Sequence, residues 1–119
     1  MRGARLLIVD DEATLRDLLR RYLERAGYEV EACGAAGEAI QKFAAAPDRY
    51  ALVITDLTLD GMNGEEMLER MRELHPAVKG MIASGYPYQP RLPGVVFLQK
   101  PFLPQMLTEA VAKALAEED

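Results

Sequence analysis

The chain has 119 residues, of which 50% are hydrophobic, and a formal net charge of −5 at pH 7. This length and composition suit one domain with its own core, so we expect a single domain over residues 1–119. The negative charge argues against nucleic acid or an anionic membrane as the main partner. The single cysteine, Cys33, excludes a disulfide framework and a thiolate metal cluster. Because the apolar run at residues 6–9 is too short for a signal peptide or a membrane span, we expect a cytoplasmic protein with no membrane insertion.

The first predicted strand is the apolar run at residues 5–10, which stops on the carboxylate of Asp10. Asp11 and Glu12 follow, and apolar residues then recur at helical spacing, which predicts an amphipathic helix. Its apolar stripe consists of Leu15, Leu18, Leu19, Tyr22, Leu23 and Ala26. Its solvent side is assigned to Arg16, Asp17, Arg20, Arg21 and Glu24. Gly27 is placed to end this helix, since glycine readily adopts the left-handed conformation required there.

A second strand, at residues 28–32, alternates apolar and acidic side chains, as expected at the edge of a sheet. Residues 36–46 are rich in alanine and predict a second helix, which Pro47 stops. An apolar run then leads from Ala51 to Asp56, and turn-forming residues follow at once. This run is typical of a buried, central strand of a parallel sheet.

The next helix is predicted at residues 65–75, with two acidic residues at its start that suit the helix dipole. One face of this helix carries Met67, Leu68, Met71 and Leu74. Residues 81–83 predict a short buried strand that stops on Ser84. In residues 86–94, proline occupies every third position. Each proline inside a helix costs about 3 kcal/mol, so we expect an extended or single-turn loop there.

The last strand is predicted at residues 95–98, shortly before Lys100. A final helix begins near Leu103, with Pro104 in its first turn. The buried stripe of this helix is predicted to consist of Leu103, Met106, Leu107, Ala110, Val111, Ala114 and Leu115. Residues 117–119 are expected to be a frayed acidic end.

Five strands that alternate with one-sided helices predict an α/β protein, a flavodoxin-like three-layer sandwich with a parallel sheet. Crossovers between parallel strands are right-handed, and the second strand belongs at an edge. The strand order 2-1-3-4-5 satisfies both conditions. In this order the first and third strands are neighbours, and open sheets of this kind bind ligands at the carboxyl ends of such strands.

The strand ends carry an unusual set of polar residues: Asp10, Asp11, Asp56, Ser84 and Lys100. Taken alone, Asp56 would be interpreted as the end of a strand or the start of a turn. Two carboxylates near 4 Å repel each other by ~4 kcal/mol at an effective dielectric constant of 20, and Mg²⁺ with oxygen ligands relieves such repulsion. Asp56, flanked by turn residues, is a candidate nucleophile toward a phosphoryl group. Lys100 and the metal would offset the charge of the transferred group.

Four short strings at successive strand ends carry a family resemblance: Ile8-Val9-Asp10-Asp11-Glu12, Val53-Ile54-Thr55-Asp56, Ala83-Ser84-Gly85 and Lys100-Pro101-Phe102. The chain resembles, over essentially its whole length, the receiver domain of two-component response regulators. The strings Ser84-Gly85-Tyr86 and Phe97-Leu98-Gln99-Lys100-Pro101-Phe102 look most like receivers attached to hybrid histidine kinases.

The resemblance implies a function as the phosphoacceptor of a phosphorelay. Asp56 would take a phosphoryl group from a phosphohistidine of a histidine kinase or a histidine phosphotransfer domain. Mg²⁺ would be held by Asp10, Asp11 and Asp56 together with the backbone carbonyl of Thr58. The domain would catalyse its own phosphorylation and dephosphorylation, and it would switch partner interactions rather than act as an enzyme on other substrates.

The same resemblance implies roles for four further residues. Ser84 and Lys100 would each contact an oxygen of the phosphoryl group on Asp56. Phe97 matches the aromatic switch position, which turns inward as Ser84 moves. Pro101 resembles a cis-proline that would direct Lys100 toward the site, and a cis bond before proline carries a penalty of only about 0.5–1 kcal/mol.

Two features depart from the family pattern. Leu59 and Asp60 stand where the family usually has Met-Pro, and Asp60 adds negative charge near the site. The stretch from Ser84 to Lys100 is shorter than usual, so the family's fourth helix should be shortened or missing. Because that helix belongs to the face through which many DNA-binding relatives dimerise, we expect a monomer that meets partners through another face, such as the first helix. No output domain follows the last predicted helix, so direct nucleic-acid binding is not expected.

Two other functions fit parts of the pattern. A pseudo-receiver would bind a partner without being phosphorylated, but such a domain should lack an acid, the hydroxyl or the lysine. A Mg²⁺-dependent phosphohydrolase acting through an aspartyl phosphate would need a second carboxylate two residues after its nucleophile. Thr58 stands at that position.

Overall fold

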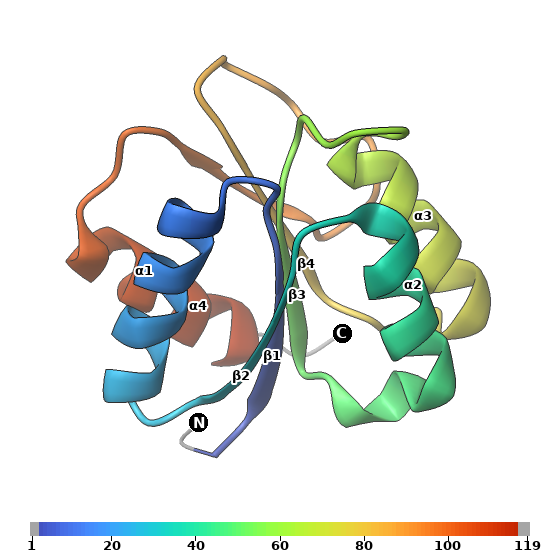
Figure 1. Ribbon diagram of the computed structural model, residues 1–119, viewed down its shortest axis with the longest axis horizontal. Coiled ribbons are helices and arrows are strands. Elements are labelled where there is room, and N and C mark those ends of the chain that lie inside the picture. The colour runs from blue at the N-terminus through green and yellow to red at the C-terminus, as the bar shows by residue number, and fades with distance from the viewer. Residues whose placement is uncertain (1–2, 117–119) are drawn as a thin grey trace.

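The computed structural model describes residues 3–116 and contains a five-stranded parallel sheet between two layers of helices (Figure 1). The sheet has the order β2-β1-β3-β4-β5, which confirms the predicted fold and strand order. Its strands are β1 (Arg5–Val9), β2 (Glu29–Cys33), β3 (Leu52–Asp56), β4 (Gly80–Ser84) and β5 (Val96–Gln99).

The helices lie in pairs on the two faces of the sheet. They are α1 (Ala13–Arg25), α2 (Ala36–Ala45), α3 (Gly64–Leu74) and α4 (Pro104–Ala116), with a short 3₁₀ helix, η1 (Pro47–Arg49), before β3. Figure 1 shows α1 and α4 on one side of the sheet and α2 and α3 on the other. No helix among the described residues is long and apolar enough to cross a membrane.

Each face of the sheet is covered by its own apolar core, because successive side chains of a strand point to opposite faces. Beneath α2 and α3 lie Leu7, Val9, Val53 and Ile82, packed with Phe43, Met67, Leu68 and Met71. Beneath α1 and α4 lie Leu6, Ile8, Leu52, Ile54 and Met81, packed with Leu19, Leu23, Leu107 and Val111. Full burial of each such side chain contributes about 1.5–3 kcal/mol, so the two cores hold the strand ends in place.

Local signals set the helix ends near their predicted positions. Gly27 follows α1 with a φ of +104°, as expected for the residue after a helix. Asn63 caps α3. Its side-chain oxygen accepts a hydrogen bond from the backbone N–H of Glu66, and the Glu66 carboxylate accepts one from the backbone N–H of Asn63. Pro104 is the first residue of α4, where its missing N–H is not needed.

Four apolar residues of the predicted helical stripes are exposed: Leu18 (44%), Leu74 (49%), Leu103 (65%) and Met106 (46%). The prediction that Leu103 and Met106 are buried is therefore wrong. Leu103 precedes the first residue of α4 and Met106 lies in its first turn, whereas burial begins at Leu107. Periodicity identifies the apolar face of a helix, but the neighbouring elements decide how far along it that face is covered. The predicted frayed end at residues 117–119 lies outside the described residues.

The connection from β4 to β5 contains no helix, as the proline spacing predicted. Residues 87–90 have no regular structure, and the segment passes toward the α2–α3 side of the sheet (Figure 1). Tyr88, Leu92 and Val95 of this segment pack against the core beneath α2 and α3. The family's usual fourth helix is thus missing, and an extended loop takes its place.

Candidate functional site

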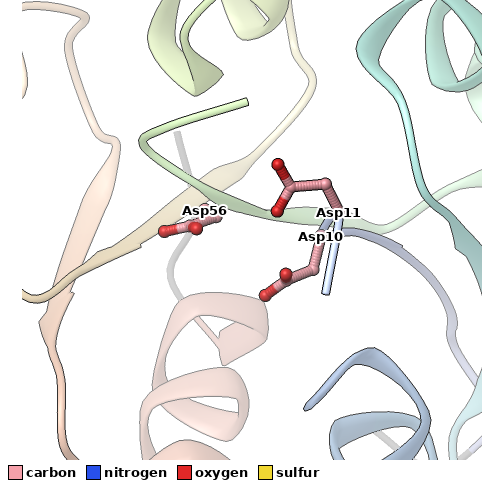
Figure 2. A group of neighbouring side chains, drawn as sticks. All are labelled: Asp10, Asp11 and Asp56. Carbon is pink, nitrogen blue, oxygen red and sulfur yellow. The ribbon is translucent and has the colours of Figure 1, made fainter. Parts of the chain in front are cut away.

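Three acidic side chains meet at the carboxyl ends of the two central strands. β1 and β3 are paired in parallel, with Val9 opposite Thr55, so the residues after each of these lie at the same edge of the sheet. One carboxylate oxygen from each of Asp10, Asp11 and Asp56 lies within 4.8 Å of the others. Figure 2 shows Asp10 and Asp11 side by side at the end of β1 and Asp56 at the end of β3.

The three acids differ in their surroundings. Asp10 is buried, Asp11 is exposed and Asp56 is half-buried. The Oδ1 atom of Asp10 accepts a hydrogen bond of 2.9 Å from the backbone N–H of Glu12. Burial raises the pKa of Asp10, and the charges of Asp56 and Asp11 raise it further; the Glu12 N–H and Lys100 only partly oppose this, so the pKa lies above its usual value.

Lys100 supplies a positive charge to this cluster. Its Nζ atom lies 3.5 Å from Oδ1 of Asp56 and 3.8 Å from Oδ2 of Asp10. The backbone N–H of Lys100 donates to the carbonyl oxygen of Ser84 at 2.8 Å, and the Lys100–Pro101 peptide bond is cis, as the resemblance implied. One ammonium group cannot balance three carboxylates, and their oxygens are the donors that a hard divalent cation prefers. The residues present therefore fit a Mg²⁺ ion.

Backbone contacts hold the loop after Asp56 close to the sheet. The N–H of Leu57 donates to the carbonyl oxygen of Ala83 at 2.9 Å, and the N–H of Gly64 donates to that of Leu57 at 2.7 Å. A Cβ atom on Gly64 would collide with the carbonyl oxygen of Asp56 and with the Thr55 side chain. Only glycine fits there, and this close approach ties the start of α3 to the end of β3.

The other predicted site residues lie at different distances from the acids. Ser84 is buried at the end of β4, next to β3, and its Oγ atom accepts a 3.0 Å hydrogen bond from the N–H of Tyr86. Thr58 is exposed and follows Asp56 by two residues. Phe97 lies half-buried in β5, with its ring centroid 6.5 Å from that of Tyr88.

Arg16 has a role that the sequence did not reveal. Helical periodicity predicts that Arg16 faces solvent, but its Nη1 atom donates to the backbone carbonyl oxygen of Asp10 at 2.8 Å. This bond fixes the chain at the end of β1 and places a guanidinium group beside the acidic cluster. Helical periodicity distinguishes the two sides of α1 but does not show which polar residue reaches over the end of the sheet.

The fold and the strand-end acids together define a phosphoacceptor receiver, and comparison with known proteins agrees. A family model described as the response regulator receiver domain matches residues 6–112. The chain belongs to this family.

Particular relatives share the sequence and the fold. The chain is 33% identical to the chemotaxis protein CheY of Thermotoga maritima, over 93% of this chain and 97% of that protein. It is 30% identical to the sensor kinase CckA of Brucella abortus over 98% of this chain, which corresponds to 13% of the kinase. The crystal structure of the receiver domain from the hybrid histidine kinase CckA superposes with a TM-score of 0.86 at 31% identity, covering 94% of this chain and 99% of that one.

These comparisons establish a class of function. The chain is a receiver domain of two-component systems, a phosphoacceptor that acts in signalling. Such domains interact with histidine kinases or phosphotransfer proteins. The match spans nearly all of the Thermotoga maritima relative but only a small part of the kinase.

Proposed function

We propose that Asp56 is the phosphoacceptor and that Asp10, Asp11, Asp56 and the carbonyl oxygen of Thr58 hold Mg²⁺. The observation that carries this proposal is the approach of three carboxylate oxygens to within 4.8 Å at the ends of β1 and β3. Core packing does not require such a cluster, and repulsion among the three charges opposes it.

In the proposed reaction, a carboxylate oxygen of Asp56 attacks the phosphorus atom of a phosphohistidine. A new oxygen–phosphorus bond forms as the nitrogen–phosphorus bond breaks, and the electron pair of the broken bond leaves with the imidazole. The Nζ atom of Lys100 lies 3.5 Å from Oδ1 of Asp56, and its positive charge would stabilise the negative charge on the phosphoryl oxygens during transfer. Bound Mg²⁺ would supply the further positive charge that phosphoryl transfer requires.

Ser84 would respond to the product of this reaction. Ser84 ends β4, the strand paired with β3, and its hydroxyl would donate to a phosphoryl oxygen on Asp56. The same domain would later lose the group to water, so that phosphorylation and dephosphorylation both use this site. Phe97 in β5 and the Lys100–Pro101 segment that follows this strand would then transmit the change to partners, as the resemblance implies.

The surface beside the acids is suited to the histidine-bearing partner. A hollow of about 260 Å³ is lined by Leu15, Lys100, Pro101 and Phe102. The exposed Leu18 lies in α1 and the exposed Met106 in α4, the two helices on this same face of the sheet, and the exposed Leu103 immediately precedes α4. An apolar surface next to the acceptor would dock a helical partner and bring its phosphohistidine to Asp56.

Incubation with Mg²⁺ and acetyl phosphate tests the proposal, with intact mass and peptide mapping as readouts. We expect one phosphoryl adduct on Asp56, stable to acid and labile to base, and none on Asp56→Asn. An undiminished adduct on Asp56→Asn would place the acceptor elsewhere. Light scattering on beryllofluoride-bound protein should show a monomer, because the helix used in the usual dimer face is missing.

A further inference from the structure

A buried carboxylate holds the loop that replaces the missing helix. Glu65, the second residue of α3, has no exposed surface. Its Oε2 atom accepts from the backbone N–H groups of Arg91 at 2.6 Å and Leu92 at 2.8 Å, and its Oε1 atom accepts from the hydroxyl of Tyr88. The Nε atom of Arg91 lies 3.7 Å from Oε1. Every one of these partners belongs to the segment between β4 and β5.

The Glu65 carboxylate is well satisfied in this position. Burial raises its pKa, but the hydrogen bonds from Tyr88, Leu92 and Arg91 outweigh this, and the pKa lies below its usual value. The hydrogen bond between Tyr88 and Glu65 raises the pKa of the Tyr88 hydroxyl. Glu65 therefore remains charged at neutral pH and continues to bind the loop.

Both sides of this contact, the start of α3 and the loop between β4 and β5, are connected to the candidate site. The start of α3 is tied to the acceptor loop through Gly64, whose N–H donates to the carbonyl oxygen of Leu57. Tyr88 is four residues from Ser84, and between them the N–H of Tyr86 donates to the Ser84 hydroxyl. The Tyr88 ring also packs against Phe97, with ring centroids 6.5 Å apart. Tyr88 thus contacts Glu65 through its hydroxyl and the proposed switch residue through its ring.

We propose that Glu65 and Tyr88 form a latch that holds the loop from β4 to β5 in the unphosphorylated arrangement. The proposal rests on the function proposed for Asp56. When the Ser84 hydroxyl turns toward a phosphoryl group on Asp56, the bond from the Tyr86 N–H to Ser84 is lost. The loop then shifts, Tyr88 leaves Glu65, and the space beside Phe97 changes. Glu65 is in this sense a positioning residue that acts through the loop on Ser84 and Phe97.

The latch has a thermodynamic consequence with a definite sign. An interaction that is present only in the unphosphorylated state stabilises that state. It therefore lowers the apparent affinity for any ligand that binds preferentially to the phosphorylated arrangement. Removing the latch must therefore increase the affinity for a phosphoryl mimic. A contact with a purely structural role would affect both states alike and would leave that affinity unchanged.

The test is a titration of Mg²⁺-loaded protein with beryllofluoride, followed by NMR. Tyr88→Phe removes the hydroxyl but keeps the ring and both backbone bonds to Glu65. We expect it to bind beryllofluoride about three- to tenfold more tightly than wild type, the effect of one hydrogen bond. Glu65→Gln should act in the same direction. The matched controls are Tyr86→Phe, because the exposed Tyr86 ring makes no side-chain hydrogen bond within residues 3–116, and Glu66→Gln on the neighbouring position of α3.

The ring resonances of Phe97 give a second readout that stability alone would not change. In Tyr88→Phe without beryllofluoride they should move part of the way toward their position in the bound wild type. Equal or weaker binding by Tyr88→Phe, with wild type binding normally, would overturn the latch and leave the phosphoacceptor proposal intact. A wild type that does not bind beryllofluoride in the presence of Mg²⁺ would overturn both proposals.

Discussion

Asp10 and Glu65 are both buried carboxylates, but their surroundings are opposite in kind. Asp10 receives one N–H bond, lies 3.8 Å from Lys100 and shares its site with two other acids. Glu65 receives two N–H bonds and one hydroxyl bond and lies near Arg91. The pKa of Asp10 is raised and that of Glu65 is lowered. Donors within the protein stabilise the charge of the Glu65 carboxylate, whereas the charge of Asp10 and its acidic neighbours calls for an additional cation.

This difference separates a ligand site from a structural contact more clearly than burial does. Both side chains are nearly inaccessible, with exposed fractions of 3% for Asp10 and 0% for Glu65. What distinguishes them is whether donors within the fold match the acceptors that the carboxylate presents. By this criterion the ends of β1 and β3 are suited to bind a cation, and the start of α3 is not.

The largest expected effect is the loss of stability in Glu65→Ala. This change leaves the Tyr88 hydroxyl and the N–H groups of Arg91 and Leu92 without their acceptor. We expect the free energy of unfolding to fall by about 3 kcal/mol or more, measured by urea denaturation. Glu66→Ala, which removes only half of the capping box, should cost about 1 kcal/mol or less. Equal losses in the two variants would show that the Glu65 contacts do not stabilise the fold.

A smaller effect of opposite sign is expected for Asp10→Asn without Mg²⁺. The substitution removes one of three repelling charges, while an amide oxygen can still accept from the N–H of Glu12. We expect the variant to be more stable than wild type by about 1 kcal/mol at neutral pH, as thermal unfolding in EDTA would show. A variant less stable than wild type would mean that Lys100 already compensates the acids.

The pH dependence of the free energy of unfolding should distinguish Asp10 from Glu65. Because the folded-state pKa of Asp10 is raised above 3.8, its contribution to stability is present below 3.8 and is lost as pH rises through the folded pKa. For Glu65, whose folded pKa is lowered, the contribution is present above 4.5 and is lost as pH falls through the folded pKa. The loss of stability with rising pH should thus be weaker in Asp10→Asn. Identical pH profiles of the variant and wild type in EDTA would contradict this.

The sequence predicted the fold because its strands and helices carry strong, distinct periodicities. Apolar runs that stop on Asp10 and Asp56, together with right-handed crossovers, were enough to bring these two residues together. The missing helix followed from the proline spacing, since that constraint is local. In each case the information lies within a few residues of the feature it determines.

The Glu65 contacts could not be predicted in this way. Within its own segment Glu65 is simply an acidic residue in the first turn of a helix, where it suits the dipole. Its burial depends on a loop more than twenty residues away that folds back onto α3. The exposure of Leu103 and Met106 has a similar cause, because it depends on where the neighbouring elements end. Such features arise from tertiary packing and leave no local pattern.

The most direct test of the cation site is the response of the melting temperature to Mg²⁺ in wild type, Asp11→Ala and Glu65→Gln. A ligand that binds only the folded state raises its stability by RT ln(1 + [L]/Kd). We expect Mg²⁺ to raise the melting temperature of wild type and Glu65→Gln by the same amount, and Asp11→Ala to respond very little. A full response in Asp11→Ala, or a lost response in Glu65→Gln, would contradict the assignment of the cation site to the ends of β1 and β3.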